Sequence, residues 1–302
     1  MNLASLDLNL LVALRALLEE RNVTRAGRRI GLSQPATSAA LARLRHHFAD
    51  DLLVRVGNGY ELTPLGAALV VPCATACGLL ERLFTSRAEF DPATEPREFT
   101  IIASDYAVAV FGAALARALH AAAPASRLIF QQVGPEIVEN TDATLSAVDG
   151  LLTPHGVVSG FPTVELYRDE WTCVIADDHP DVGDRLTMDD LARLPWVVYQ
   201  RPYDAPAARQ LGMLGLEPHV EVSVQNFQLL PGLVVGTRRI ALIQRRLAQL
   251  LAPTAAVRIL PCPFEAVPVN EALWWHPVHT QDAAHIWLRE TAARVAADLQ
   301  TG

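Results

Sequence analysis

The first part of this chain takes its fold from residues 23–38, whose sequence is VTRAGRRIGLSQPATS. The apolar residues of its first half recur at helical spacing, and Thr24 is expected to cap the helix that carries them. Gly31 ends that helix, and another begins with Ser33 as its N-cap and Pro35 in its first turn. Two short helices joined by a glycine-containing turn predict a helix-turn-helix.

The sequence on either side of this motif completes a small domain. Leucines in residues 6–18 form one apolar stripe at helical spacing, which predicts a preceding helix. Two β-rich runs in residues 52–63 flank the sequence Gly-Asn-Gly at 57–59, and this pattern predicts a β-hairpin, or wing. Because these features occur in order, they favour a winged helix-turn-helix over a plain helical bundle with solvated arginines.

The start of the second helix is the part of such a motif that reads DNA, because it lies against base edges in the major groove. Gln34 can pair with adenine, whereas the arginines are placed to bind phosphates, which position a protein without specifying sequence. An arginine on the wing can reach a minor groove or a phosphate. The residues expected to contact DNA are Arg28, Arg29, Ser33, Gln34, Pro35, Thr37, Ser38, Arg43 and Arg55.

Composition excludes several classes of enzyme. All 25 basic residues are arginine, so no lysine can form a Schiff base, a pyridoxal phosphate linkage or a Walker-type phosphate loop. The sequence also has no Gly-x-Ser-x-Gly, glycine-rich phosphate loop or Cys-x-x-Cys. We therefore expect no enzymatic activity and no cofactor.

Charge and cysteine content indicate the partner and the compartment. Residues 1–66 hold 8 arginines against 6 acidic residues, whereas residues 67–302 hold 17 against 27, which favours a nucleic-acid contact at the N-terminal end. The N-terminus lacks the pattern of a signal peptide, and four scattered cysteines are too few for a disulfide scaffold. The longest uncharged stretch, residues 62–80, contains prolines and glycines and is not expected to span a membrane. The expected location is the cytoplasm.

The pattern changes after the wing to a long helix and then to alternating strands and helices. The long helix is expected over residues 65–87, with Pro72 kinking or interrupting it. The alternation beyond it predicts open, mostly parallel sheets that bind ligands at the carboxyl ends of their strands. The expected strands are 99–103, 127–133, 171–176, 196–200, 220–224, one within 232–243, and 272–275, and the expected helices are 105–122 and 283–299.

Five motifs connect the chain to a known family. They are DLNLL at 7–11, VTRA at 23–26, LSQPATS at 32–38, LARLR at 41–45 and LTPLG at 62–66. Together they resemble the DNA-binding domain of LysR-type transcriptional regulators, in the branch with nodulation-protein-D-like and salicylate-responsive regulators, and the resemblance extends to the end of the chain. Gly27 departs from the alanine usual in the family, which is expected to loosen its helix by up to ~1 kcal/mol.

This resemblance implies a domain organisation and an assembly. Residues 1–64 would form the winged helix-turn-helix, residues 65–91 a linker helix for dimerisation, and residues 92–302 an effector-binding α/β domain. That domain would have two Rossmann-like subdomains, hinged like a type 2 periplasmic binding protein. A homodimer or homotetramer would bind two half-sites of a pseudo-palindromic operator about one helical turn apart. Subdomain I is expected at about 92–165 and 268–302, and subdomain II at about 166–267, with crossings near 163–168 and 266–270.

A small-molecule effector is expected in the cleft between the two subdomains. Ser104 follows the first strand, where a helix N-terminus offers free N–H groups, although the same residue can simply cap its helix. Phe111, two turns on, is either an apolar wall of the cleft or ordinary core. The expected effector-binding residues are Ser104, Phe111, Asp169, Tyr203, Gln225, Asn226 and Asn270.

Asp169 bears on the chemistry of that effector. Salicylate-responsive relatives tend to have a basic or neutral residue at this crossover, whereas this chain has YRDE at 167–170. The acidic body also disfavours an anionic aromatic acid, unless Arg168 turns inward to offset it. The expected effector is therefore small, partly aromatic, and neutral or a hydrogen-bond donor.

Cysteines and histidines leave other functions open. A redox-sensing regulator would need Cys173 and Cys262 to lie with their Cα atoms within about 7 Å. A solute-binding protein would share the body, but it needs a signal sequence and no winged head. Two further cysteines and three histidines are interpreted as packing residues rather than metal ligands. They are Cys73, Cys77, His276, His279 and His285.

Overall fold

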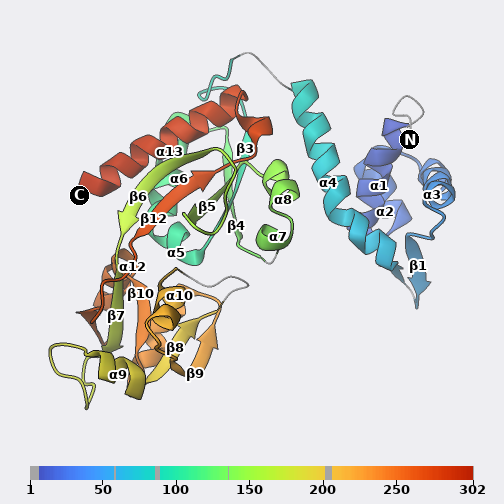
Figure 1. The fold of residues 1–302 in the computed structure, drawn as a ribbon. Helices are drawn as coiled ribbons and strands as arrows, with labels where there is room; N and C mark the ends of the chain where they lie inside the picture. Colours follow the sequence, from blue (N-terminus) through green and yellow to red (C-terminus); the bar gives the residue numbers. More distant parts are fainter. Residues whose placement is uncertain (1–6, 58, 86–88, 135, 201–205, 302) are drawn as a thin grey trace. The chain divides into compact units, whose positions relative to one another are not determined.

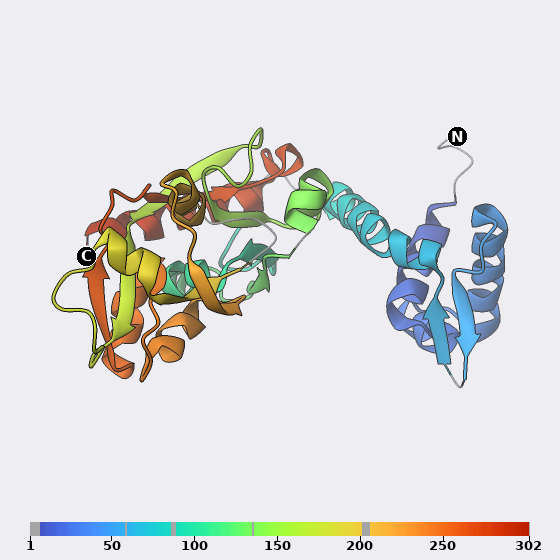
Figure 2. The same ribbon diagram turned by 60° about the horizontal axis from the view of Figure 1, so that its bottom comes forward.

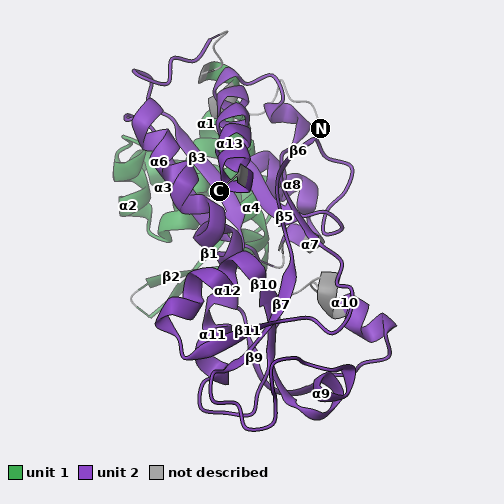
Figure 3. Cartoon of the chain, turned by 90° about the vertical axis from the view of Figure 1, so that its left-hand side faces the viewer, with its two compact units in different colours: residues 1–86 green, residues 87–302 purple. Residues whose placement is uncertain are grey.

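The computed structural model describes residues 7–57, 59–85, 89–134, 136–200 and 206–301. The chain divides into two compact units, residues 1–86 and residues 87–302, which Figure 3 shows in different colours. Within the described residues, no helix is both long enough and apolar enough to cross a membrane.

The first unit is a winged helix-turn-helix followed by a long helix. Its elements are α1 (Leu8–Glu20), α2 (Val23–Arg29), α3 (Gln34–Phe48), β1 (Leu53–Val56), β2 (Gly59–Leu62) and α4 (Pro64–Thr85). Ser33 caps α3 as predicted, and Gly31 has a φ of +70°, a conformation that favours glycine. The wing strands β1 and β2 pair antiparallel, as Figure 2 shows. The predicted motif is therefore confirmed.

The cap of α2 differs from the prediction. Asn22, not Thr24, is the N-cap, and its side-chain oxygen accepts a hydrogen bond from the backbone N–H of Arg25 at 2.9 Å. Asparagine ranks above threonine as an N-cap residue. Thr24 consequently lies inside the helix.

The helix α4 belongs to the first unit and continues through Pro72 without interruption. It packs against α1, where Cys73 and Cys77 are buried and the sulfur of Cys73 lies 3.7 Å from the carbonyl oxygen of Leu11. Burial raises the pKa of the Cys73 thiol to about 12. These cysteines are packing residues, as expected. Of the kink or interruption predicted at Pro72, the interruption does not occur, because α4 is one continuous helix from Pro64 to Thr85.

The second unit begins and ends in subdomain I. Its elements are β3 (Glu98–Ala103), α5 (Asp105–Ala107), the π-helical segment η2 (Val108–Gly112), α6 (Ala113–Ala122), β4 (Arg127–Gln132), α7 (Glu136–Glu139), α8 (Thr141–Ala147), β5 (Gly150–Pro154), β6 (Thr163–Asp169), β12 (Val269–Trp274), η5 (Pro277–His279) and α13 (Ala283–Thr301). The strand order is β4-β3-β5-β12-β6, and α13 packs against β6 and α6 (Figure 1). α5, η2 and α6 together form the predicted helix at 105–122.

Subdomain II is inserted between β6 and β12. Its elements are β7 (Trp171–Ala176), α9 (Met188–Arg193), β8 (Pro195–Tyr199), α10 (Pro206–Met213), β9 (His219–Val224), η3 (Phe227–Leu229), α11 (Leu230–Val234), β10 (Ala241–Gln244), α12 (Arg245–Leu251), η4 (Ala252–Thr254) and β11 (Val257–Pro261). β7 lies between β10 and β11, and β8 pairs with β9. A bridge from Trp196 to Ile240 links the two groups of strands.

The sheets are mixed, so the expectation of mostly parallel sheets is wrong. β3 is parallel to β4 and β5, and β8 is parallel to β9, but β12 runs antiparallel to both β5 and β6. β7 is antiparallel to both of its neighbours. The physical reason is the insertion of subdomain II: β6 leaves subdomain I and β12 returns to it, so these neighbours must run in opposite directions. The sequence predicted neither β5, β6 nor β11 as strands.

The core covers both faces of the sheet of subdomain I. Alternate residues of β3 point to opposite faces, so Ile101 packs with α6 and α13 whereas Ile102 packs with the α7 and α8 side. Subdomain II has a further core around the fully buried Trp196, whose indole N–H donates to the carbonyl oxygen of Leu191. Both crossings between subdomains lie side by side, with Val269 opposite Asp169.

Candidate DNA-binding surface and effector cleft

The helix α3 presents small and polar side chains at its start. Gln34 and Ser38 are exposed, while Leu41 and Leu44 on the other face are buried in the core of the first unit. Hydroxyl and amide groups of this size are those that read base edges in a major groove. The start of α3 is therefore the candidate reading surface.

The four arginines predicted to contact DNA fall into two groups. Arg29 pairs with a carboxylate of α1 at 2.5 Å, and Arg43 pairs with Asp7 at 3.0 Å. Arg28 and Arg55 are exposed, and neither makes an ion pair with any residue that the structure describes. A DNA phosphate would compete with a carboxylate for Arg29 and Arg43, but not for Arg28 and Arg55.

Thr37 does not reach the surface. Its side chain is fully buried, and its hydroxyl donates to the carbonyl oxygen of Ser33 at 3.0 Å. A Cβ atom on Gly27 would lie 2.5 Å from that hydroxyl oxygen, so Thr37 fills the space that a larger residue at 27 would need. The expectation that the Thr37 side chain contacts DNA is therefore wrong, because the residue packs α3 against α2.

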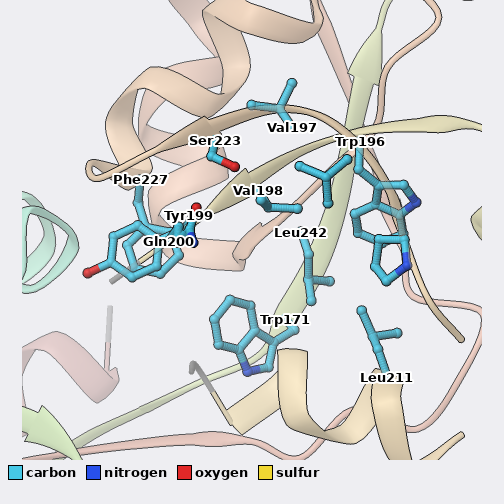
Figure 4. A pocket seen from close by; sticks show the side chains of 12 residues that line it. Trp171, Trp196, Val197, Val198, Tyr199, Gln200, Leu211, Ser223, Phe227 and Leu242 are labelled. Carbon is cyan, nitrogen blue, oxygen red and sulfur yellow. The ribbon is translucent and has the colours of Figure 1, made fainter. Parts of the chain in front are cut away.

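The candidate effector site begins with a cavity of about 440 Å³ in subdomain II, which we name the outer chamber. Trp171, Tyr199 and Phe227 lie along it, and the rings of Tyr199 and Phe227 stack with centroids 3.6 Å apart (Figure 4). Its volume lies within the range of pockets for small molecules. The remaining lining is mostly apolar: Trp196, Val197, Val198, Gln200, Leu211, Pro218, Val220, Ser223 and Leu242.

A second cavity of about 30 Å³, the inner chamber, shares those three aromatic rings with the outer chamber. Subdomain I contributes Ser104, Thr153 and Glu271 to its wall, and subdomain II contributes Gln244. The hydroxyl oxygen of Ser104 accepts a hydrogen bond from the backbone N–H of Ala107 at 3.1 Å. The two chambers together therefore reach the junction of the subdomains.

Polar atoms around the inner chamber are buried without partners. They include the Thr153 hydroxyl, the Trp171 indole nitrogen, the Gln244 side-chain oxygen and both carboxyl oxygens of Glu271. Glu271 is only 1% exposed, and burial together with the nearby Asp169 raises the pKa of its carboxyl to about 8. Because buried polar groups are normally hydrogen-bonded, this cluster indicates a site for a ligand.

Comparison with known proteins identifies the family of the chain. Residues 8–67 match the profile of the bacterial regulatory helix-turn-helix protein, lysR family, and residues 93–297 match the LysR substrate binding domain. The chain belongs to the LysR family. It is a LysR-type transcriptional regulator, with a helix-turn-helix head and an effector-binding domain.

Relatives of this LysR regulator match nearly its full length. It is 35% identical to nodulation protein D 2 of Rhizobium tropici, over 96% of this chain and 93% of that protein. A probable transcriptional regulator from Pseudomonas aeruginosa has a TM-score of 0.73 and 27% identity, over 96% of this chain and 97% of that one. CbnR in complex with its target DNA has a TM-score of 0.68 and 14% identity, over 96% and 100% of the chains, and shows the shared fold.

Two of the effector-binding residues predicted for the LysR regulator have other roles. Phe111 is fully buried core, with its ring centroid 5.9 Å from that of Tyr167. Asp169 is 4% exposed and accepts hydrogen bonds from the Tyr106 hydroxyl at 2.9 Å and from the backbone N–H of Glu170 at 2.8 Å. It lines neither chamber, because its carboxylate is occupied within the crossing between subdomains.

The prediction for β12 is wrong by one residue. Asn270 is exposed, whereas its neighbour Glu271 faces the inner chamber. Successive side chains of a strand point to opposite faces, so a shift of one position selects the wrong face. Glu271 lies two residues from both Val269 and Leu273, which are apolar and buried. This spacing is the sequence signal that was missed.

The other predicted effector residues divide as follows. Ser104 caps α5, and it also lines the inner chamber. Gln225 and Asn226 are exposed and line neither chamber, because they lie beyond the end of β9. Tyr203 lies outside the described residues. Sequence reasoning missed the residues that define the chambers: Thr153, Trp171, Tyr199, Phe227, Gln244 and Glu271.

Cys173 and Cys262 lie together, with their sulfur atoms 4.0 Å apart and both thiols free. Cys173 is fully buried on β7, whereas Cys262 is partly exposed after β11. The hydrogen bond with Cys173 and the positive charge of Arg245 lower the pKa of Cys262, and the same hydrogen bond and burial raise that of Cys173. Cys262 is therefore the more reactive thiol of the pair.

The C-terminal histidines are structural. His279 is buried and bonds the carbonyl oxygen of Leu145 at 3.2 Å, and the buried His285 bonds that of Asp149. Their rings stack on each other at 5.3 Å. Among the residues that the structure describes, no group of three or more His, Cys, Asp or Glu could hold a metal ion.

Proposed function

We propose that this LysR regulator is controlled by a small, partly aromatic effector that donates hydrogen bonds in the two chambers. The observation that carries the proposal is the set of orphaned polar atoms at the junction of the subdomains, in which the acceptors of Glu271 and Gln244 predominate. The rings of Trp171 and Tyr199 supply an aromatic surface for the body of the ligand. Glu271 takes the role that the sequence suggested for Asp169.

Binding there is proposed to change the angle between the subdomains. Asp105 of subdomain I accepts a hydrogen bond from the backbone N–H of Gln228 of subdomain II at 2.8 Å, so the two subdomains already touch beside the inner chamber. A ligand that fills both chambers would favour one angle. In an oligomer that angle sets the spacing of the DNA-binding heads, and by linkage the effector and the DNA arrangement bias each other equally.

The proposed assembly is a homodimer or homotetramer on a pseudo-palindromic operator in the cytoplasm, acting by binding and not by catalysis. α4 exposes Val71, Leu83 and Phe84, and Phe84 is 81% exposed. Large apolar side chains on one exposed helix favour a contact with another subunit. In the head, Gln34 and Ser38 would read bases while Arg28 and Arg55 bind phosphates.

Genomic footprinting with the full-length protein tests this function, because the genes beside the protected site nominate the effector.

Ser223 is an exposed residue in the wall of the outer chamber. Ser223→Trp should fill that chamber and abolish the response to the effector while DNA binding stays normal. Ser159→Trp, on an exposed loop that lines neither chamber, is the matched control and should respond normally. A normal response of Ser223→Trp would contradict an effector site in the cleft.

A second candidate function, redox sensing, is favoured by the contact between Cys173 and Cys262. Hydrogen peroxide would oxidise the two thiols to a disulfide, taking two protons and two electrons from them and leaving two molecules of water. Because a disulfide needs sulfur atoms about 2.05 Å apart, β7 and the segment after β11 would have to move closer. Peptide mapping by mass spectrometry after peroxide treatment tests it: a Cys173–Cys262 cross-link that alters DNA binding supports redox sensing, and two unmodified thiols contradict it.

A further inference from the structure

The two chambers differ in size and in chemistry. The outer chamber has about 440 Å³ and is walled largely by aromatic and aliphatic side chains, whereas the inner chamber has about 30 Å³, room for one or two waters. They meet at the rings of Trp171, Tyr199 and Phe227. A ligand that uses both must therefore have a large apolar body and a polar end no bigger than a water molecule or two.

The polar wall of the inner chamber consists mainly of acceptors. Both carboxyl oxygens of Glu271, the side-chain oxygen of Gln244 and the hydroxyl of Thr153 are buried there without a partner. No lysine exists in the chain, and no arginine or histidine lies among the described residues that line either chamber. Ionising a buried acidic group with no cation beside it is costly unless a ligand supplies the opposite charge.

We propose that the inner chamber binds the ammonium group of an organic amine, whose aromatic body lies in the outer chamber. This inference rests on the proposed function and specifies the ligand of the same site. A primary ammonium is about as large as water and carries three N–H donors, which match the acceptors of Glu271, Gln244 and Thr153. Aromatic faces at the mouth of the chamber stabilise a cation further.

Other ligand classes fit the inner chamber less well. A carboxylate cannot donate to the side-chain oxygen of Gln244, and it can pair with Glu271 only while that carboxyl keeps its proton. An alcohol offers one O–H donor and leaves further acceptors unpaired, which costs binding free energy. The indole N–H of Trp171 is a donor without a partner, and an oxygen on the ligand or a water can accept from it.

Binding of an ammonium should be coupled to a proton. The titratable groups near Glu271 are Asp169, Tyr106 and Tyr167, and none of these supplies a positive charge. The positive charge of Arg246 acts on Asp169 and Tyr167, whereas the pKa of Glu271 is set by its burial and by Asp169. Burial holds the pKa of the Glu271 carboxyl at about 8, so the empty site is mostly protonated at pH 7. An ammonium stabilises the ionised form, and the carboxyl therefore releases close to one proton per ligand at pH 7.

Calorimetry on the full-length protein tests the proposal with three probes that share a phenylethyl body and differ in the charge of the end group: phenethylamine, 2-phenylethanol and 3-phenylpropionate. The amine should bind at least about tenfold more tightly than the other two. Titrations in two buffers of different ionisation enthalpy should show the released proton for the amine only. Glu271→Gln should weaken binding of the amine at least about tenfold and leave binding of the alcohol unchanged. The exposed control Glu217→Gln should bind all three probes as the wild type does.

Several outcomes would contradict the proposal that the ligand is an amine. They are binding of the alcohol or the carboxylate as tight as that of the amine, amine binding without proton release, and no amine binding at millimolar concentration. The variant Ser223→Trp separates these failures from failure of the proposed function. If it abolishes binding of a neutral or anionic probe, the cleft is still the effector site but its ligand is not an amine. If probes bind Ser223→Trp unchanged, the cleft itself is not the site.

Discussion

The hydroxyl oxygen of Thr37 lies where a side chain at Gly27 would begin, since a Cβ atom there would be 2.5 Å from it. The same Cβ would lie 2.9 Å from the carbonyl oxygen of Leu32. Gly27 thus permits close approach of α2 and α3, and α2 forms despite it because the helix is held by packing.

Gly27→Ala should destabilise the first unit by about 1–3 kcal/mol, because the added methyl group overpacks this contact. Thermal unfolding followed by calorimetry measures the change. Thr37→Ala in the same chain should recover part of the loss, although the contact with Leu32 remains. Gly78→Ala in α4, where nothing lies within 4 Å, is the control and should stabilise slightly. Equal changes in stability for Gly27→Ala and Gly78→Ala would contradict a packing role for Gly27.

Gln34→Ala and Arg28→Ala should affect DNA binding differently. Gln34→Ala should relax base preference at one position, at a cost of about 1–3 kcal/mol for the preferred base, while non-specific binding stays the same. Arg28→Ala should weaken binding to all sequences and reduce the salt dependence by about one unit of slope. Gel-shift titrations at several salt concentrations distinguish the two. Equal loss of specific and non-specific binding in Gln34→Ala would show that this residue does not read a base.

Glu271 should make the empty protein less stable as pH rises. Its carboxyl keeps a proton up to a pKa of about 8 when folded, whereas in the unfolded chain it loses it near 4.5. Between these values the folded state holds more protons, so its contribution to stability falls by up to about 1.4 kcal/mol per pH unit, with no further change above pH 8. Denaturant unfolding at pH 6 and pH 8.5 should show Glu271→Gln gaining stability relative to the wild type at the higher pH. A constant difference would contradict the buried carboxyl.

Asp169→Asn should lower stability without changing effector affinity. The carboxylate accepts hydrogen bonds from the Tyr106 hydroxyl and from backbone N–H groups of Glu170 and Arg246, and an amide cannot accept all of them. The expected loss is about 1–3 kcal/mol in the unfolding of the second unit. If effector affinity fell while stability stayed constant, Asp169 would belong to the binding site after all.

Sequence patterns predicted the head of this regulator better than its cleft. The cap at Ser33, the helix end at Gly31 and the hairpin around residues 57–59 depend on contacts within a few residues, so local sequence contains the information. The cleft depends on which face of a strand points inward. The choice of Asn270 in place of Glu271 shows how a one-residue error in that assignment selects the wrong side chain.

The sequence by itself determined the order of domains, the helix-turn-helix and the absence of lysine chemistry, because these follow from local propensity, capping and composition. Only the tertiary structure decided that Thr37 is buried, that Asp169 lies within the crossing, and that Glu271 faces a cavity without a cation. The physical reason is that burial and charge pairing are set by residues distant in the chain. Glu271 and Thr153 lie on paired strands, whereas Gln244 comes from the other subdomain, and no short stretch of sequence places these three around one chamber.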